Sequence, residues 1–214
     1  SLPANAGKQQ WGNLPGAALS LAIAEAASNA GRFTLVLTEG SQSAERLQEE
    51  LAFFAPNLPV LHFPDWETLP YDVFSPHQDI ISQRIAALYQ LPQLSRGILV
   101  VPIATALHRL APKRFLLGSS LVLDVGQTLD VEQMRTRLEA AGYRCVDTVY
   151  EHGEFAVRGA LIDLFPMGSD KPYRIDLFDD EIETLRTFDP ETQRSVDKVE
   201  SVSYTHLRAH ETKA

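Results

Sequence analysis

Hydrophobic positions in the first half of the chain alternate between helical and strand-like spacings. Good helix formers follow Pro15-Gly16 and stop at Asn29-Ala30-Gly31, and the apolar run 33–38 then predicts a buried strand. The same alternation predicts strands at 60–63 and 97–102, and helices after Ser41 as the expected N-cap, over 80–90, and up to about Leu110. Strands that are apolar on both faces and alternate with helices predict a parallel sheet with helices on both faces.

The pattern changes near residues 112–118. A strand is predicted at 120–125, followed by a helix that Asp130 caps and Gly142 closes. Further strands with tight turns are predicted at about 146–150, 155–164, 173–178 and 181–188. One helix with a run of strands predicts a small α+β domain with an antiparallel sheet.

These patterns divide the sequence into three parts. We expect an α/β domain over residues 1–117, an α+β domain over 118–202, and an atypical tail over 203–214 that is disordered or foreign to the native protein. His206 and His210 in the tail stand four residues apart, as metal ligands on a helix do. No third ligand type accompanies them, so we predict no metal site.

Composition narrows the classes of function. The 214 residues carry a formal net charge of −9, which is unlike an autonomous nucleic-acid-binding protein that neutralises phosphates with Lys and Arg. The single cysteine, Cys145, allows neither a disulfide framework nor a cysteine metal site, and this favours a reducing, cytoplasmic location. No apolar run is long enough to predict a membrane helix, and the start shows no signal-peptide pattern.

The segment before the first helix resembles a phosphate-binding loop that lacks its key residues. When Ser20 is aligned with the final Ser/Thr of G-x-x-x-x-G-K-[ST], Leu19 falls on the lysine place and Ala18 on the last glycine place. Gly16 lies two places before the required glycine. A leucine cannot supply charge to a triphosphate, so we predict a degenerate loop; a plain helix start remains the alternative.

A loop rich in aromatic residues and proline covers 65–72 and continues as 75–81. It is either a contact loop or a rigid connector whose aromatic side chains close the sheet edge, and its acidic neighbours favour the connector. Its carboxylates are accompanied by no nucleophile and no set of metal ligands, so we predict no catalytic residues.

Alternation along the later strands places two arginines and a phenylalanine outside the core. In 173–178 the even positions Arg174 and Phe178 point away from the core face, and Arg158 does so in the preceding strand. An exposed phenylalanine beside arginines is typical of a protein-binding hot spot. Alternatively, Arg174 pairs with Asp176 or Asp163 and Phe178 folds over an edge. The pattern leaves both interpretations open.

The motifs at 153–166 and 173–182 resemble the second domain that UvrB shares with the bacterial transcription-repair coupling factors (Mfd). The segments 65–72 and 75–81 resemble the coupling factors rather than UvrB, and the resemblance covers about residues 8–202. It implies a P-loop-NTPase-like parallel-sheet domain similar to UvrB domain 1a, followed by an α+β domain similar to UvrB domain 2.

The resemblance also implies a function. It implies that the second domain binds UvrA through Arg158, Arg174 and Phe178, in transcription-coupled nucleotide excision repair. Full-length members use ATP and Mg²⁺ in a downstream motor and engage RNA polymerase and double-stranded DNA; those regions are absent here, and no cofactor is expected in this chain. The alternatives are an ATP-binding helicase-type domain and a UvrB-like damaged-DNA-binding domain, which the missing lysine and the absence of a tyrosine-rich hairpin disfavour.

Overall fold

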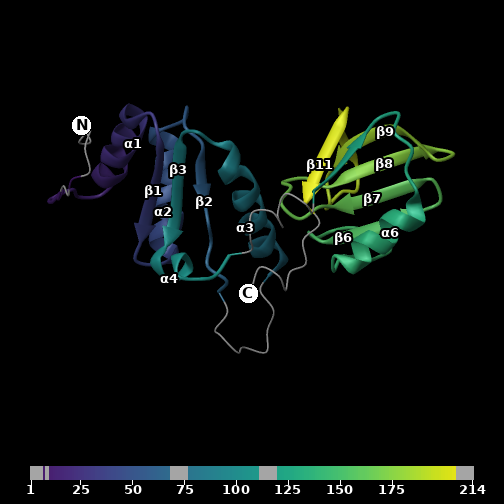
Figure 1. Cartoon of the computed structure of the whole chain (residues 1–214), viewed down its shortest axis with the longest axis horizontal. Helices are drawn as coiled ribbons and strands as arrows, with labels where there is room; N and C mark the ends of the chain where they lie inside the picture. The colour runs from purple at the N-terminus through teal and green to yellow at the C-terminus, as the bar shows by residue number, and fades with distance from the viewer. Residues whose placement is uncertain (1–6, 8–9, 68–76, 111–119, 206–214) are drawn as a thin grey trace. The chain divides into compact units, whose positions relative to one another are not determined.

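The computed structural model describes residues 7, 10–67, 77–110 and 120–205 (Figure 1). Contacts between Cα atoms divide the chain into two compact units. The first unit comprises Ser1–Asp65 and Gln90–His108, and the second comprises Trp66–Tyr89 and Arg109–Ala214. The chain is a mixed α/β protein, with a parallel sheet in the first unit and a mainly antiparallel sheet in the second. The predicted domain boundary near residue 118 lies outside the described residues and stays a prediction.

The first unit is a three-stranded parallel sheet of order β1-β3-β2 with helices packed on it. Its elements are α1 (Ala18–Ala30), β1 (Phe33–Thr38), α2 (Ser41–Phe54), β2 (Val60–His62), the 3-10 helix η1 (Leu91–Gln93), β3 (Gly97–Pro102) and α4 (Ile103–Ala106). Small side chains on α1 and the apolar face of α2, including Leu47 and Leu51, pack on Ile98 and Val100 of β3. This burial of apolar surface is the main stabilising contribution to the unit.

Three predicted details of the first unit differ from the structure. Gly40, in extended conformation, precedes α2, and Ser41 is its first helical residue with no capping hydrogen bond from a side chain to the helix start. Helix α4 ends at Ala106 rather than near Leu110. On the face of β1 away from α2, Leu35 and Leu37 are 58% and 50% exposed. The predicted cover on both sheet faces is therefore incomplete among the described residues.

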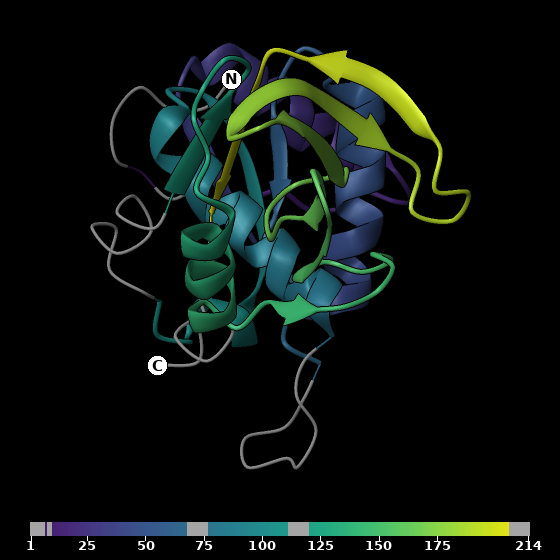
Figure 2. The same cartoon turned by 90° about the vertical axis from the view of Figure 1, so that its right-hand side faces the viewer.

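The second unit contains a six-stranded sheet of order β10-β9-β8-β7-β6-β5, together with the strand pair β11-β4. Its strands are β4 (Ser120–Asp124), β5 (Arg144–Cys145), β6 (Glu154–Arg158), β7 (Leu161–Phe165), β8 (Tyr173–Phe178), β9 (Glu181–Phe188), β10 (Ser195–Val199) and β11 (Ser201–Thr205). Its helices are α3 (Gln78–Gln90) and α6 (Val131–Ala140). The last residue of α3, Gln90, is grouped with the first unit. Figure 2 shows the strong twist of the sheet.

Helix α3 is predicted from the sequence as part of the first domain, but its contacts lie in the second unit. The hydroxyl of Ser82 accepts a hydrogen bond from the backbone N–H of Gly168 at 2.9 Å. His152 lies between α3 and the loop after β7, with one ring nitrogen 2.8 Å from the Asp79 carboxylate and the other 2.8 Å from the carbonyl oxygen of Ser169. These polar contacts, which hydrophobic periodicity does not reveal, link α3 to the second unit.

The strands of the second unit differ from the predicted ones in three places. The run 155–164 is a hairpin, β6 and β7, with Gly159 at φ +62° in its turn, rather than one strand. The segment 146–150 is not a strand, because its buried Val149 packs on the face of the sheet instead of joining its edge. Strands β10 and β11 are absent from the sequence prediction.

The predicted tail overlaps the end of the last strand and stays a prediction. The backbone of 203–205 continues β11, which pairs antiparallel with β4. Residues 206–214, with His206 and His210, lie outside the described residues, as do 68–76 of the aromatic loop.

Helix α6 offers a direct test of the local sequence code. The carboxylate of Asp130 accepts a hydrogen bond from the backbone N–H of Gln133 at 2.9 Å, as the capping pattern predicts. We expect Asp130→Ala to lower the free energy of unfolding by about 1 kcal/mol, because this N–H loses its acceptor. Urea unfolding measures the change. The matched Asp130→Ser variant keeps a capping oxygen and should remain close to wild type; equal loss in both variants would contradict the capping role.

Candidate protein-interaction surface

The sheet of the second unit has two unlike faces. Alternation buries Ile162, Ile175 and Leu185 on one face, which we call the inner face. The other, the outer face, carries the side chains of Arg158 and Arg174. The sequence prediction that these two arginines share a face away from the main core is consistent with this register.

One end of the outer face is closed by a second, smaller apolar cluster. Val149 packs there against Ala156, Phe165 and Phe188, and all four side chains are buried. The side-chain amide of Gln193 donates to the carbonyl of Val149 at 2.9 Å and so ties the covering segment to the turn between β9 and β10. Among the described residues, the other end of the outer face is left uncovered.

Asp163 of β7 lies where the closed end meets the open end. Its carboxylate is fully buried, and it accepts two hydrogen bonds from the Arg174 guanidinium, at 2.7 and 2.9 Å. Arg158, from β6 on the opposite side, pairs with the same carboxylate. A buried carboxylate needs such partners because removing its charge from water is costly. Asp163 thus brings together two of the three predicted binding residues.

Arg174 is held on several sides. Its guanidinium also donates to the carbonyl of Gln193 at 3.0 Å and stacks over the Phe188 ring at 4.7 Å. Hydrogen bonding to Asp163 raises the pKa of Arg174 above its usual range, so the group keeps its charge. Only 13% of the side chain is exposed. The pairing of Arg174 with Asp163, one of the alternatives left open by the sequence, is the arrangement that the structure has.

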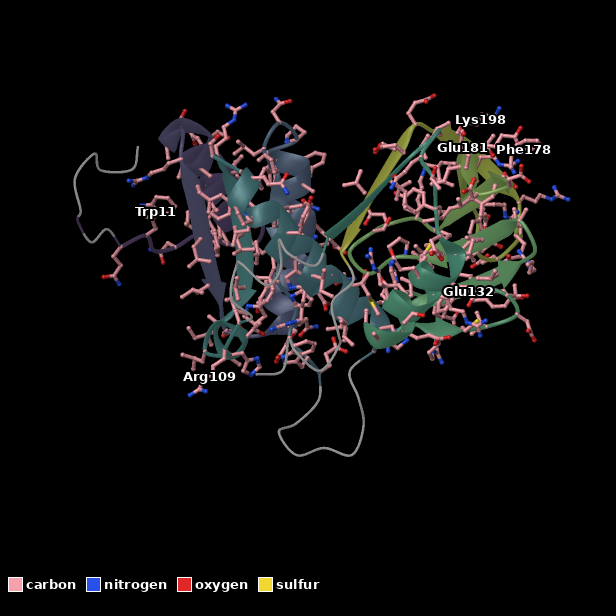
Figure 3. All side chains as sticks on the ribbon, turned by 45° about the vertical axis from the view of Figure 1, so that its right-hand side comes forward. Trp11, Arg109, Glu132, Phe178, Glu181 and Lys198 are labelled. Carbon is pink, nitrogen blue, oxygen red and sulfur yellow. The ribbon has the colours of Figure 1, made fainter. Side chains whose placement is uncertain are left out.

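Phe178 is the exposed residue of the predicted set. It ends β8 opposite Glu181, next to a two-residue turn in which Asp179 has φ +55° (Figure 3). Its ring is 70% exposed, so it does not fold over the sheet edge. An aromatic side chain fixed at the end of a strand offers a large apolar contact at low conformational cost.

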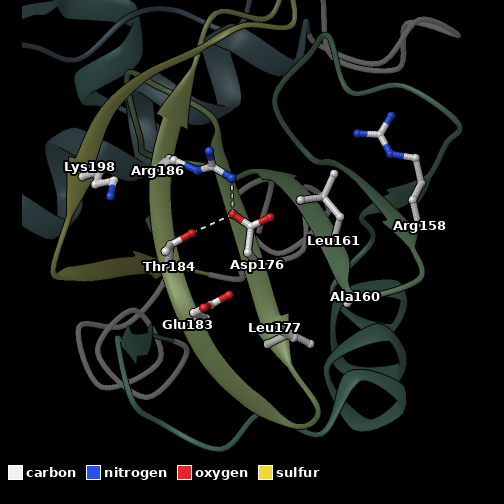
Figure 4. A pocket seen from close by; sticks show the side chains of 9 residues that line it. All are labelled: Arg158, Ala160, Leu161, Asp176, Leu177, Glu183, Thr184, Arg186 and Lys198. Atoms are coloured by element: carbon white, nitrogen blue, oxygen red, sulfur yellow. Dashed lines mark hydrogen bonds and ion pairs between the residues drawn. The ribbon is translucent and has the colours of Figure 1, made fainter.

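The open end of the outer face contains a hollow of about 540 Å³ (Figure 4). Asp176 lies at its centre, where it accepts a hydrogen bond from the Thr184 hydroxyl at 2.6 Å and pairs with Arg186. The hollow is lined by Arg158, Ala160, Leu161, Asp176, Leu177, Glu183, Thr184, Arg186 and Lys198. Arg186 and Lys198 are not predicted from the sequence, because their place depends on strand register. Alternation within 181–188 does give Arg186 the same parity as the outward Thr184.

The segment predicted as a degenerate phosphate loop lies at the start of α1. Gly16 has φ +56°, Ala18 begins the helix, and Leu19, in the lysine place, is half exposed. The hydroxyl of the buried Ser20 donates to the Glu50 carboxylate, which also accepts from Arg46 at 2.8 Å. The hydrogen bond from Ser20, and after it the one from Arg46, lowers the pKa of Glu50 and keeps its carboxyl group ionised. The Ser20 hydroxyl is therefore hydrogen-bonded to a carboxylate, whereas in a working phosphate loop the equivalent hydroxyl would be offered to a metal–phosphate complex.

Two searches confined to the described residues concern other classes of site. In that part of the chain, no helix is both long and apolar enough to cross a membrane. Within the same residues, no group of three or more His, Cys, Asp or Glu side chains could hold a metal ion.

The sheet of the second unit lies within a region that matches a known protein family. Residues 121–205 match the family model of the UvrB interaction domain. This range contains the whole outer face, from Arg158 through Phe178 to Lys198.

The chain as a whole is similar to transcription-repair-coupling factors. It is 50% identical to that of Escherichia coli over 212 residues, which are 99% of this chain and 18% of the relative. It is 50% identical to that of Haemophilus influenzae over 198 residues (92% and 17%), and 33% identical to that of Staphylococcus aureus USA300 over 183 residues (86% and 16%). The predicted resemblance is confirmed, and the chain spans less than a fifth of the length of these relatives.

The shared carboxylate predicts a stability effect. Asp163→Asn keeps the shape of the side chain but removes the charge that both guanidiniums share. We expect the free energy of unfolding to fall by about 3 kcal/mol, because the largely buried Arg174 loses its counter-ion. Urea unfolding measures this. Asp197→Asn, the same change in an exposed pair with Lys171 at 3.3 Å, should cost under about 1 kcal/mol. Similar effects of the two variants would show that Asp163 has no special role.

Proposed function

We propose that this chain is a UvrA-recruiting module of a transcription-repair coupling factor, acting in transcription-coupled nucleotide excision repair. The observation that carries the proposal is the match of residues 121–205 to the UvrB interaction domain, within a chain half identical to a coupling factor. A domain that is named for interaction and shared with UvrB fits a common partner of the two proteins, and UvrA is that partner in the family that the motifs resemble.

The geometry of the outer face supports a protein partner. Phe178 supplies an exposed apolar anchor, and Arg158 supplies a partly exposed guanidinium held by a buried carboxylate. Aromatic residues and arginine on a rigid sheet are the residue types that dominate protein–protein binding energy. Arg174 contributes mainly by orienting this surface, since most of its hydrogen-bonding capacity is used within the chain.

The first unit is, in the same proposal, a nucleotide-fold relic similar to UvrB domain 1a, and the second unit is similar to UvrB domain 2. The parallel order β1-β3-β2 with helices between the strands is compatible with that origin. Leu19 in the lysine place and the Glu50 carboxylate at Ser20 both disfavour a bound triphosphate. We therefore propose that this chain is not itself an enzyme and holds no cofactor.

The whole protein would supply the remaining activities. On the family resemblance, it would be a cytoplasmic ATP-dependent translocase that uses Mg²⁺, moves on double-stranded DNA and displaces stalled RNA polymerase. Those activities would lie in regions outside this chain, which accounts for only 18% of the Escherichia coli relative.

The proposal predicts that Phe178→Ala weakens binding to UvrA by about 2 kcal/mol, or about thirtyfold in Kd, because the partner loses its apolar anchor. Calorimetry with purified UvrA of Escherichia coli measures it. Phe53→Ala is the matched control, since Phe53 is 79% exposed on α2 of the first unit. Wild-type affinity in the Phe178 variant would remove Phe178 from the binding surface.

Variants of Arg158 and Arg174 require a measurement of stability in addition to the measurement of UvrA affinity. Arg174→Ala strips a buried carboxylate of its main partner, so its free energy of unfolding must be measured beside its affinity. Arg158→Ala leaves Arg174 on Asp163 and tests direct contact more cleanly. We expect both to weaken UvrA binding, with Arg174→Ala also losing stability.

The absence of a nucleotide site is tested by titrating Mg²⁺–ATP into the chain in a calorimeter. We expect no saturable heat up to about 1 mM ATP, because the loop offers no cation and Glu50 repels the phosphates. Micromolar affinity would overturn this part of the proposal and would favour the helicase-type alternative.

A further inference from the structure

The register of the second sheet aligns three cations across neighbouring strands. Arg174 of β8 lies opposite Arg186 of β9, and Arg186 lies opposite Lys198 of β10. We call these three residues the cation row. We propose that Arg186 and Lys198 are further partner-binding residues, and that the row receives carboxylate side chains of an acidic protein surface. This inference rests on the proposed function and extends its surface beyond Arg158, Arg174 and Phe178.

Like charges placed directly opposite each other on a sheet destabilise it. The chain opposes this repulsion with two carboxylates, Asp163 beside Arg174 and Asp176 beside Arg186. Lys198 has no acidic partner among the described residues, since the ion pairs of that part of the chain do not include it. The row thus ends in an uncompensated cation, on a chain whose net charge is −9.

Arg186 also has capacity left for a ligand. One of its terminal nitrogens pairs with Asp176, which leaves the guanidinium further N–H donors. Its side chain is 32% exposed and lines the hollow together with Lys198 (Figure 4). The lining of the hollow carries three cations, Arg158, Arg186 and Lys198, against two carboxylates, Asp176 and Glu183. A carboxylate that enters on the side of Arg186 and Lys198 therefore meets a net attraction.

The neighbours of the row favour an acidic protein rather than a nucleic acid. Phe178 follows the hollow-lining Leu177 in β8, and the turn after it carries Asp179, Asp180 and Glu181. A phosphate backbone would be repelled by this acidic turn, and nucleic-acid binding draws on several phosphate contacts made by Lys and Arg. A protein can match both features, with an apolar pocket for Phe178 and carboxylates for the row.

The division of labour within the row follows from exposure. Arg174 is nearly enclosed and bonded to Asp163, Gln193 and Phe188, so it is a positioning residue. Lys198 is exposed and Arg186 partly so, and these two side chains reach a partner.

The test compares two charge reversals that change the net charge equally. Lys198→Glu reverses the free end of the row, and Lys171→Glu reverses a lysine that already pairs with Asp197. Binding of the purified chain to UvrA of Escherichia coli is measured at low and high salt. We expect Lys198→Glu to bind roughly tenfold more weakly than wild type at low salt, with the difference shrinking at high salt. Lys171→Glu and the charge-conserving Lys198→Arg should bind as wild type.

Other outcomes overturn the inference in distinguishable ways. Wild-type affinity of Lys198→Glu, or an equal loss in Lys171→Glu, would remove the row while leaving the proposed function intact. No binding of UvrA by the wild-type chain would overturn the proposed function itself. Salt-dependent binding of a duplex oligonucleotide that Lys198→Glu abolishes, with UvrA binding unchanged, would make the row a phosphate site and contradict an acidic protein partner.

Discussion

The outer face of the second sheet depends on one buried carboxylate, that of Asp163. A carboxylate removed from water is stable only when charged or hydrogen-bonding groups replace the water, and here two guanidiniums from the flanking strands β6 and β8 do so. The same contact that compensates the buried charge fixes Arg158 and Arg174 in place. In the proposed binding role of these arginines, stability and recognition share one interaction, so a loss of binding in their variants is interpretable only beside a measured free energy of unfolding.

Asp163 also lies between the closed end of the outer face, which is packed with apolar side chains, and the open end, which is exposed to solvent. At the closed end, Val149, Phe165 and Phe188 form a small second core, and the Phe188 ring lies under the Arg174 guanidinium. At the open end, the hollow around Asp176 remains open to solvent and lined by Arg186 and Lys198. The packed end holds the strands that carry the side chains of the open end. Those side chains therefore lose little conformational entropy when a partner binds.

The sequence predicts the faces of this sheet well and its register poorly. Alternation in 173–178 is enough to separate Arg174 and Phe178 from Ile175, because side-chain direction along a strand is a local property. The opposition of Arg174, Arg186 and Lys198 depends on hairpin lengths and on bulges between Asp176 and Leu177 and before Lys198, which a single sequence does not encode visibly. For the same reason Val149 reads as a strand residue, although it packs across the sheet; long-range burial overrode its local propensity.

The chain has a negative net charge, whereas the outer face of its second sheet carries a row of cations, and each of these features has a physical consequence. A total of −9 opposes general attraction to nucleic acids, whose phosphates require cations. The segment predicted as a degenerate phosphate loop also has a negative group beside it, since Ser20 donates its hydroxyl hydrogen bond to the Glu50 carboxylate. On the outer face, cations of three strands align in register, and the β8–β9 hairpin that carries two of them ends in an acidic turn next to the exposed Phe178. In the proposed role of Arg186 and Lys198, the negative net charge would disfavour polyanions while the local cations attract a protein whose carboxylates and apolar pocket match them. Selectivity would then come as much from what the chain repels as from what these two residues attract.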